Sequence, residues 1–176
     1  MLGRVGSRRM VADFATARVS HLTFGVIVGF LLAAGSMAFL GWLASQGVEF
    51  KPNEAEQEVM PHNLAELLMA GSTIVLLGPF AEELYFRGAL MSWLRDKIGL
   101  VLAIAISAAL FGLVHFNFLV FPGIQGWILT GVIAGIGVVN GLWAARSGSL
   151  WPAFATHAGF NATMVAAAMI APEATI

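Results

Sequence analysis

The chain has 176 residues, of which 59% are hydrophobic and only 11% are charged, and its mean hydropathy of +0.84 indicates an integral membrane protein rather than a water-soluble one. The net charge of −1 and the lack of a basic block give no reason to expect nucleic acid as a partner. The absence of cysteine excludes a disulfide framework, a thiolate metal site and a cysteine nucleophile.

The first element is an uncharged stretch, residues 23–43, which is long enough to cross a hydrocarbon core of about 30 Å. A cleaved signal peptide would have a shorter apolar core, so we expect a retained transmembrane anchor. The preceding segment, residues 1–22, is predicted to be a cytoplasmic basic tail. It carries Arg4, Arg8, Arg9 and Arg18.

An acidic loop is predicted for residues 46–62, followed by a membrane-embedded core over residues 63–171 and a short tail, 172–176. Helix resumes near residue 63 and extends to about residue 95, with a kink expected at Pro79.

Three further spans follow, at residues 100–118, 127–143 and from Ser149 to about residue 170, where Ser149 has the character of a helix N-cap. The fold class is therefore all-α, a multi-pass bundle of about five spanning helices.

Lys and Arg residues predict the orientation of these spans. The amino-terminal tail, the turn at Arg95 and Lys97, and Arg146 fall on one side, which the positive-inside rule makes cytoplasmic. The acidic loop and the C-terminus then lie outside.

Glycine pairs four residues apart occur in the first and fourth spans, a spacing that lets membrane helices approach closely. They are Gly25 with Gly29, Gly131 with Gly135, and Gly137 with Gly141. Packing inside one bundle is the favoured interpretation, with a dimer interface as the alternative. The oligomeric state is left open.

Two adjacent glutamates, Glu82 and Glu83, lie inside the apolar core, where ionisable groups are rare and mark functional sites. Glu83 and Arg87 are four residues apart on one helical face and are predicted to form an ion pair. Glu82 points about 100° away and stays free of that pair, so we assign chemistry to Glu82 and a supporting role to Glu83 and Arg87.

Two histidines on separate apolar segments are the other candidates. His157 and Asn161 share one helical face, and their N–H groups suit the stabilisation of an oxyanion. Taken alone, His115 fits packing as well as catalysis. Hydrogen bonds between helices are an alternative for His157 and Asn161, and they are the favoured explanation for Asn117 and Asn140.

Together, Glu-Glu-x-x-x-Arg, Phe-x-x-x-His and His-x-x-x-Asn, from about Gly78 to Met164, resemble the CAAX protease and bacteriocin-processing family of intramembrane proteases, also called the Abi family. The resemblance implies that Glu82 is the catalytic base, that His115 positions the water, and that His157 and Asn161 hold the oxyanion. It makes Glu83, Arg87 and Phe111 supporting residues.

The resemblance leaves the mechanism open between a metal-free glutamate protease, which we favour, and a zinc enzyme with Glu82, His115 and His157 as ligands. It implies a membrane-anchored or lipid-associated protein substrate: a prenylated CAAX protein, a leader peptide or a C-terminal sorting anchor. A five-span bundle is smaller than the eukaryotic enzyme, so we expect a bacterial plasma membrane. A non-enzymatic immunity or assembly factor is the alternative from another class.

Depth provides a check on this site. Counting about 1.5 Å per residue from the basic turns places Glu82 at ~20 Å, His115 at ~27 Å and His157 at ~12 Å. Straight helices therefore predict that the three groups do not meet, unless some helices are tilted.

Overall fold

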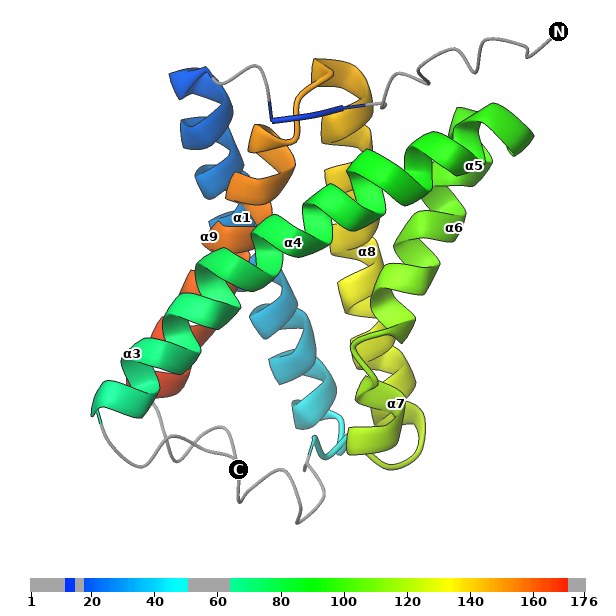
Figure 1. The fold of residues 1–176 in the computed structure, drawn as a ribbon. Helices are drawn as coiled ribbons and strands as arrows, with labels where there is room; N and C mark the ends of the chain where they lie inside the picture. The colour runs from blue at the N-terminus through cyan, green and yellow to red at the C-terminus, as the bar shows by residue number, and fades with distance from the viewer. Residues whose placement is uncertain (1–11, 15–17, 51–63, 171–176) are drawn as a thin grey trace, which may run out of the picture.

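The computed structural model describes residues 12–14, 18–50 and 64–170. Most of the predicted basic tail and acidic loop, and all of the predicted tail 172–176, lie outside these residues. The described part is helical, which confirms the predicted all-α bundle (Figure 1). Its elements are α1 (Val19–Ser45), α3 (Leu64–Ser72), η1 (Thr73–Leu77), α4 (Gly78–Glu83), η2 (Leu84–Leu90), α5 (Met91–Ile98), α6 (Leu100–Leu113), α7 (Asn117–Val120), α8 (Ile124–Ser147) and α9 (Trp151–Ile170).

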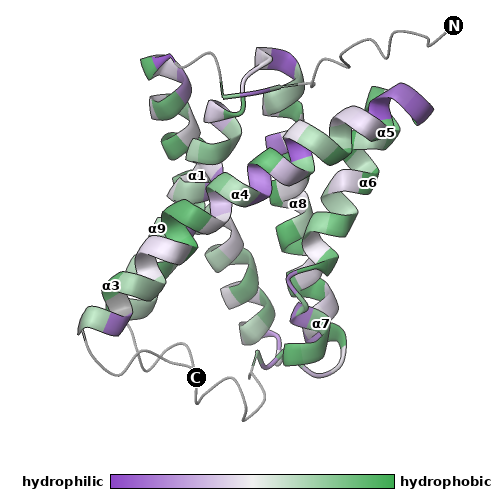
Figure 2. Ribbon diagram, viewed as in Figure 1, coloured by the Kyte–Doolittle hydropathy of each residue, from purple (hydrophilic) through white to green (hydrophobic). Residues whose placement is uncertain are grey.

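Four stretches of the described chain are long and apolar enough to cross a membrane: Val19–Ser45, Leu100–Val120, Ile124–Ser147 and Trp151–Ile170. Hydrophobic residues occupy most of the length of these helices (Figure 2). Many of their large apolar side chains point outward, including Phe30, Val101 and Leu119. Such a surface suits a bilayer, where lipid tails cover it.

The remaining predicted span is one long helix, residues 64–98, in which α3, η1, α4, η2 and α5 follow one another without a break. At about 1.5 Å per residue it extends roughly 50 Å, well beyond a hydrocarbon core of about 30 Å. A helix of this length crosses a bilayer obliquely. It runs diagonally across the other helices in Figure 1.

Two π-helical stretches, η1 and η2, flank α4 within this long helix. Pro79 lies at the start of α4 and does not end the helix, because the wider turn of η1 precedes it. Such turns are rare and frequently occur at functional sites. Here they bracket the segment that carries Glu82 and Glu83.

The third predicted span, residues 100–118, lies within the stretch Leu100–Val120, but its helix is interrupted near the end. Helix α6 stops at Leu113, and α7 begins only at Asn117. Between them Phe116 adopts a left-handed conformation with φ of 54°, which costs energy for a residue with a side chain. The break falls at His115.

The basic residues gather at one end of the bundle. In Figure 1 the start of α1 and the ends of α5 and α8 all lie at the same end of the bundle, and these are the chain ends that carry Arg18, Lys97 and Arg146. Helix α8 ends at Gly148 (φ of 64°), and the Ser149 hydroxyl accepts a hydrogen bond from the Trp151 N–H at the start of α9.

Two of the three glycine pairs serve packing inside the chain. A Cβ added to Gly29 would collide with the Thr156 carbonyl oxygen of α9, and one added to Gly25 would lie 2.5 Å from the Ala155 Cβ. Gly137 and Gly141 contact α6 in the same manner. These contacts agree with packing within one bundle. A Cβ added to Gly131 or Gly135 would meet no atom of another described segment within 4 Å.

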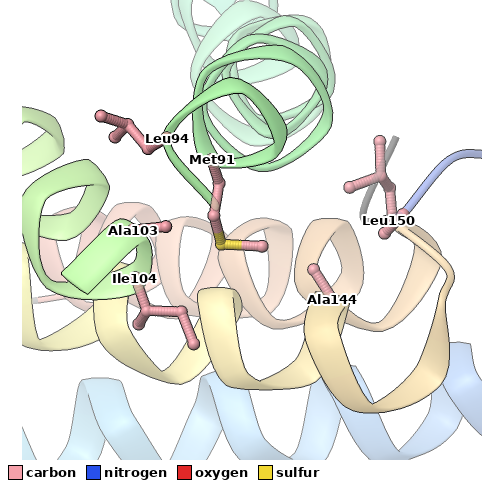
Figure 3. Close-up of a cluster of buried hydrophobic side chains, with 7 residues drawn as sticks. Met91, Leu94, Ala103, Ile104, Ala144 and Leu150 are labelled. Atoms are coloured by element: carbon pink, nitrogen blue, oxygen red, sulfur yellow. The ribbon is translucent and has the colours of Figure 1, made fainter. Parts of the chain in front are cut away.

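A hydrophobic cluster fixes the long helix against its neighbours at the basic end. Met91 is fully buried and lies at its centre (Figure 3). Its partners come from α5, α6, α8 and the turn before α9, and they are Leu94, Ala103, Ile104, Ala144 and Leu150, with Ala12 from the amino-terminal segment. This packing helps to hold α4 and its glutamates in place.

Candidate active site

Glu82, His115 and His157 meet in space although they come from three different helical segments. The Glu82 Oε2 atom lies 3.9 Å from His115 Nε2 and 3.8 Å from His157 Nε2. The depth count from straight helices is therefore wrong. That count assumes straight, parallel helices, whereas the 64–98 helix runs diagonally across the others (Figure 1).

These three side chains line a cavity of about 360 Å³. The Glu82 Oε2 atom is buried and has no hydrogen-bond partner among the described residues. Distances of 3.8 and 3.9 Å are too long for direct hydrogen bonds and leave room for a bridging atom. The other lining residues are Thr73, Ile74, Gly78, Pro79, Phe111, Ile133, Ile136, Phe160 and Asn161.

Glu83 is fully buried, and its Oε1 atom contacts residues of three elements. It accepts hydrogen bonds from Arg87 Nη1 (3.0 Å) on η2 and Asn140 Nδ2 (2.8 Å) on α8, and it contacts His157 Nδ1 (3.1 Å) on α9. Arg87 also donates to the Gly137 carbonyl at 3.2 Å. The predicted ion pair of Glu83 and Arg87 is present, and the burial cost of each charge is offset by these contacts.

The hydrogen-bond partners of the two histidines fix their tautomers. His115 Nδ1 lies 2.7 Å from the Phe111 carbonyl oxygen, and His157 Nδ1 lies 3.1 Å from the Glu83 carboxylate. Both partners only accept, so each Nδ1 carries the proton. In the neutral rings Nε2 is therefore an acceptor, and both Nε2 atoms face Glu82. The neutral site presents three acceptors around one space, which suits a water molecule or a cation.

Phe111 joins the parts of this site. Its ring lies under the Arg87 guanidinium, with the Cζ atom 4.3 Å from the ring centroid. It makes edge contacts with both His115 and His157, at centroid distances of 4.8 and 5.3 Å. Only 1% of Phe111 is exposed, so the ring holds the two imidazoles and the guanidinium in a fixed relation.

A scan against protein-family models identifies the family of this chain. The model described as Type II CAAX prenyl endopeptidase Rce1-like matches residues 64–163. The chain belongs to this Rce1-like family. Membership makes it a CAAX protease-type enzyme of the membrane, with a membrane-associated peptide or protein as substrate. Neither the search of curated proteins nor the search of solved structures returned a match.

The Rce1-like match contains every residue predicted for the site, while α1 lies outside it. In this chain α1 still supports the site, because Gly25 and Gly29 contact the turn of α9 that carries Thr156 and His157. Helix α1 thus packs on the segment of α9 that carries His157.

Asn161, the last of the predicted site residues along the chain, has a contact that sequence reasoning missed. Its Nδ2 atom donates to the Ile74 carbonyl oxygen at 2.8 Å. In the π-helical register of η1 the Gly78 N–H donates a hydrogen bond to the Thr73 carbonyl, five residues earlier. In the same register the Ile74 carbonyl would accept a hydrogen bond from the N–H of residue 79. That residue is Pro79, which has no N–H. Asn161 supplies the missing donor and ties α9 to the long helix.

Two further links in the Rce1-like site were not predicted. The interpretation of Asn140 as a source of an interhelical hydrogen bond is correct, but its partner is Glu83. The contact of Glu83 with His157 is unexpected, since the sequence indicates only the local pair with Arg87. A polar residue at each of positions 83, 140 and 157 was the only available signal, and it does not show which of them meet.

No group of three or more His, Asp or Glu side chains is spaced to hold a metal ion within the described ranges. Glu82, His115 and His157 have the chemistry of a catalytic zinc set, two imidazole nitrogens and one carboxylate. The donor types therefore fit zinc, whereas the present spacing does not.

Proposed function

We propose that this chain hydrolyses a peptide bond of a membrane-anchored substrate by means of a water molecule that Glu82 activates. The observation that carries the proposal is the unpartnered Glu82 Oε2, which faces two acceptor nitrogens in a largely apolar cavity within the described part of the chain. A water molecule that donates to Glu82 Oε2 and His115 Nε2 has both hydrogens engaged, so a lone pair of its oxygen points into the cavity.

The water oxygen attacks the carbonyl carbon of the scissile bond, and Glu82 takes the proton. The resulting tetrahedral intermediate carries an oxyanion. When it collapses, the C–N bond breaks and Glu82 returns the proton to the leaving amine. The products are a new carboxyl group and a new amino group, and Glu82 is regenerated as a carboxylate.

His157 and Asn161 hold the oxyanion in this proposal. His157 must donate from Nε2, which requires the imidazolium, since Nδ1 already carries a proton that faces Glu83. The contact of Nδ1 with the Glu83 carboxylate fixes the orientation of the ring. Asn161 uses one N–H on the Ile74 carbonyl and keeps a second N–H for the oxyanion.

The test is Glu82→Gln, which keeps the size of the side chain and removes the base. We expect cleavage of a CAAX-type reporter in membranes to fall by at least about 10²-fold, within the usual range for the loss of a general base. Glu66→Gln is the matched control, because Glu66 lies in α3, away from the cavity residues. Normal turnover by a stably expressed Glu82→Gln variant would contradict the proposal.

A zinc enzyme is the alternative mechanism, which the donor types of Glu82, His115 and His157 fit. Zinc bound by Glu82, His115 and His157 would polarise the scissile carbonyl or the attacking water. Metal analysis of the purified protein, together with activity after chelation and dialysis, separates the two mechanisms. We expect full activity without metal. Loss of activity on chelation, restored by zinc, would instead favour the metal mechanism.

The orientation is also a proposal. With Arg18, Lys97 and Arg146 at one end of the bundle, the positive-inside rule makes that end cytoplasmic. The C-terminal end of α9 then faces the opposite side of a bacterial plasma membrane. Reporter fusions at the two termini test this, and equal reporter activity at both would contradict it.

A further inference from the structure

A second cavity lies at the basic end of the bundle, between the start of α1 and the end of α8. It has a volume of about 320 Å³, at the lower end of the range for ligand sites. It shares no lining residue with the cavity around Glu82. The lining residues are Arg18, His21, Trp143, Arg146 and Ser147.

The ionisable side chains that line this cavity are all basic. Two guanidinium groups and one imidazole face the cavity, and no carboxylate of the described residues lines it. Neither Arg18 nor Arg146 forms an ion pair within the described residues, whereas Arg95 at the same end pairs with Asp96 at 2.8 Å. The His21 Nδ1 atom is buried and lacks a described hydrogen-bond partner. An anion in the cavity would relieve the repulsion between the two arginines and accept from all three groups.

The position of the cavity indicates which anion. Helices α1 and α8 are both long and apolar enough to span a membrane, and the cavity lies at their ends. Trp143 lines it, and tryptophan is enriched at the level of lipid headgroups. Guanidinium groups bind phosphate oxygens in pairs of hydrogen bonds. A phospholipid whose phosphate group lies in this cavity would have its acyl chains alongside the exposed apolar face of α1, which includes Phe24 and Ile27.

We propose that this cavity binds the phosphate group of an anionic phospholipid through Arg18, Arg146 and His21. The lipid would join the amino-terminal turn of α1 to the end of α8. Since α1 packs on the segment of α9 that carries His157, the bound lipid would stabilise the anchor helix against the catalytic core.

The experiment measures binding on the purified full chain in detergent. Phosphatidylglycerol, phosphatidylcholine and inorganic phosphate are titrated separately, with the unfolding midpoint and native mass spectrometry as readouts. We expect phosphatidylglycerol to bind and to raise the midpoint. Arg18→Gln and Arg146→Gln should each weaken its apparent affinity about fivefold, the effect of one basic residue near an anionic lipid surface.

Arg95→Gln is the matched control, because it removes a cation from the same end of the bundle but not from the cavity. Arg146→Lys, which retains the charge, should keep most of the affinity, and midpoints without lipid verify folding. A response to phosphatidylglycerol but not to inorganic phosphate assigns a lipid headgroup, whereas an equal response to inorganic phosphate assigns a general phosphate site and refutes the lipid. An equal response to phosphatidylcholine, or an equal loss in Arg95→Gln, would overturn the proposal.

Discussion

Replacing Glu83 by Gln is the sharpest structural test of the site. The change keeps the shape of the side chain but removes the negative charge. Glu83 is 0% exposed and Arg87 is 0% exposed, so the guanidinium would be left in the interior without a counter-charge. Breaking a buried pair in this way costs about 3–5 kcal/mol in soluble proteins. The carbonyl oxygen of the introduced amide can still accept from Asn140 or Arg87, so we expect the low end, about 3 kcal/mol.

The assay is thermal or denaturant unfolding of the purified chain in detergent, with Glu66→Gln as the control carboxylate. At about 2–4 °C per kcal/mol for a chain of this length, the expected fall in the unfolding midpoint is roughly 6–12 °C. The catalytic rate should fall as well, because Glu83 contacts His157 Nδ1 and an amide at position 83 would hold the imidazole ring less firmly than the carboxylate does.

A second substitution separates the ion pair from general damage. In Glu83→Gln/Arg87→Gln no unpaired charge remains, so the double variant should lose less stability than the sum of the two single variants. Two outcomes would refute the reasoning. The first is a fall in the unfolding midpoint of Glu83→Gln of no more than about 1 °C, far less than the fall expected. The second is a loss of stability in the double variant that equals the sum of the losses in the two single variants.

Two further predictions concern the helix contacts. Gly29→Val places a side chain against the Thr156 backbone and should cost about 3 kcal/mol, whereas the control Gly35→Val, with no atom within 4 Å of its added Cβ, should be near neutral in unfolding assays. Asn161→Ala leaves the Ile74 carbonyl without its donor and should cost about 1 kcal/mol. In a Pro79→Ala background the restored N–H can serve that carbonyl, so the same substitution should cost less; an equal cost in both backgrounds would count against the contact.

The sequence was sufficient for those features that follow from local spacing. The pair of Glu83 with Arg87 is an i,i+4 contact on one helix, and both residues are found bonded as the spacing predicts. Runs of apolar residues likewise predicted the spans, since their length is fixed by the bilayer. The family motifs supplied the candidate residues, and the Rce1-like match over residues 64–163 confirms the family.

The features that failed depend on how helices are placed relative to one another. The depth count for Glu82 assumes a helix along the membrane normal, and nothing in a local pattern reports the tilt of the 64–98 helix. The contact of Asn161 with Ile74 involves a backbone carbonyl. Every residue has such a group, so the residue type does not indicate which carbonyl is the acceptor. From the sequence, Pro79 predicts only a kink. Its missing N–H also leaves the Ile74 carbonyl in the preceding turn without a backbone donor, and the sequence does not show that Asn161 supplies one.

Both failures have one physical origin, and it bears on how the site works. A helix that crosses the bilayer obliquely brings its middle, at Glu82, to the helices that carry His115 and His157, but its backbone must then be tied to them where it passes. The π-helical turn at η1 exposes a carbonyl to Asn161, and η2 carries Arg87, which reaches Gly137 on α8. The irregular turn at η1 therefore supplies a backbone acceptor that a straight α-helix, with its backbone groups satisfied internally, could not offer, and the Arg87 side chain adds a second interhelical bond.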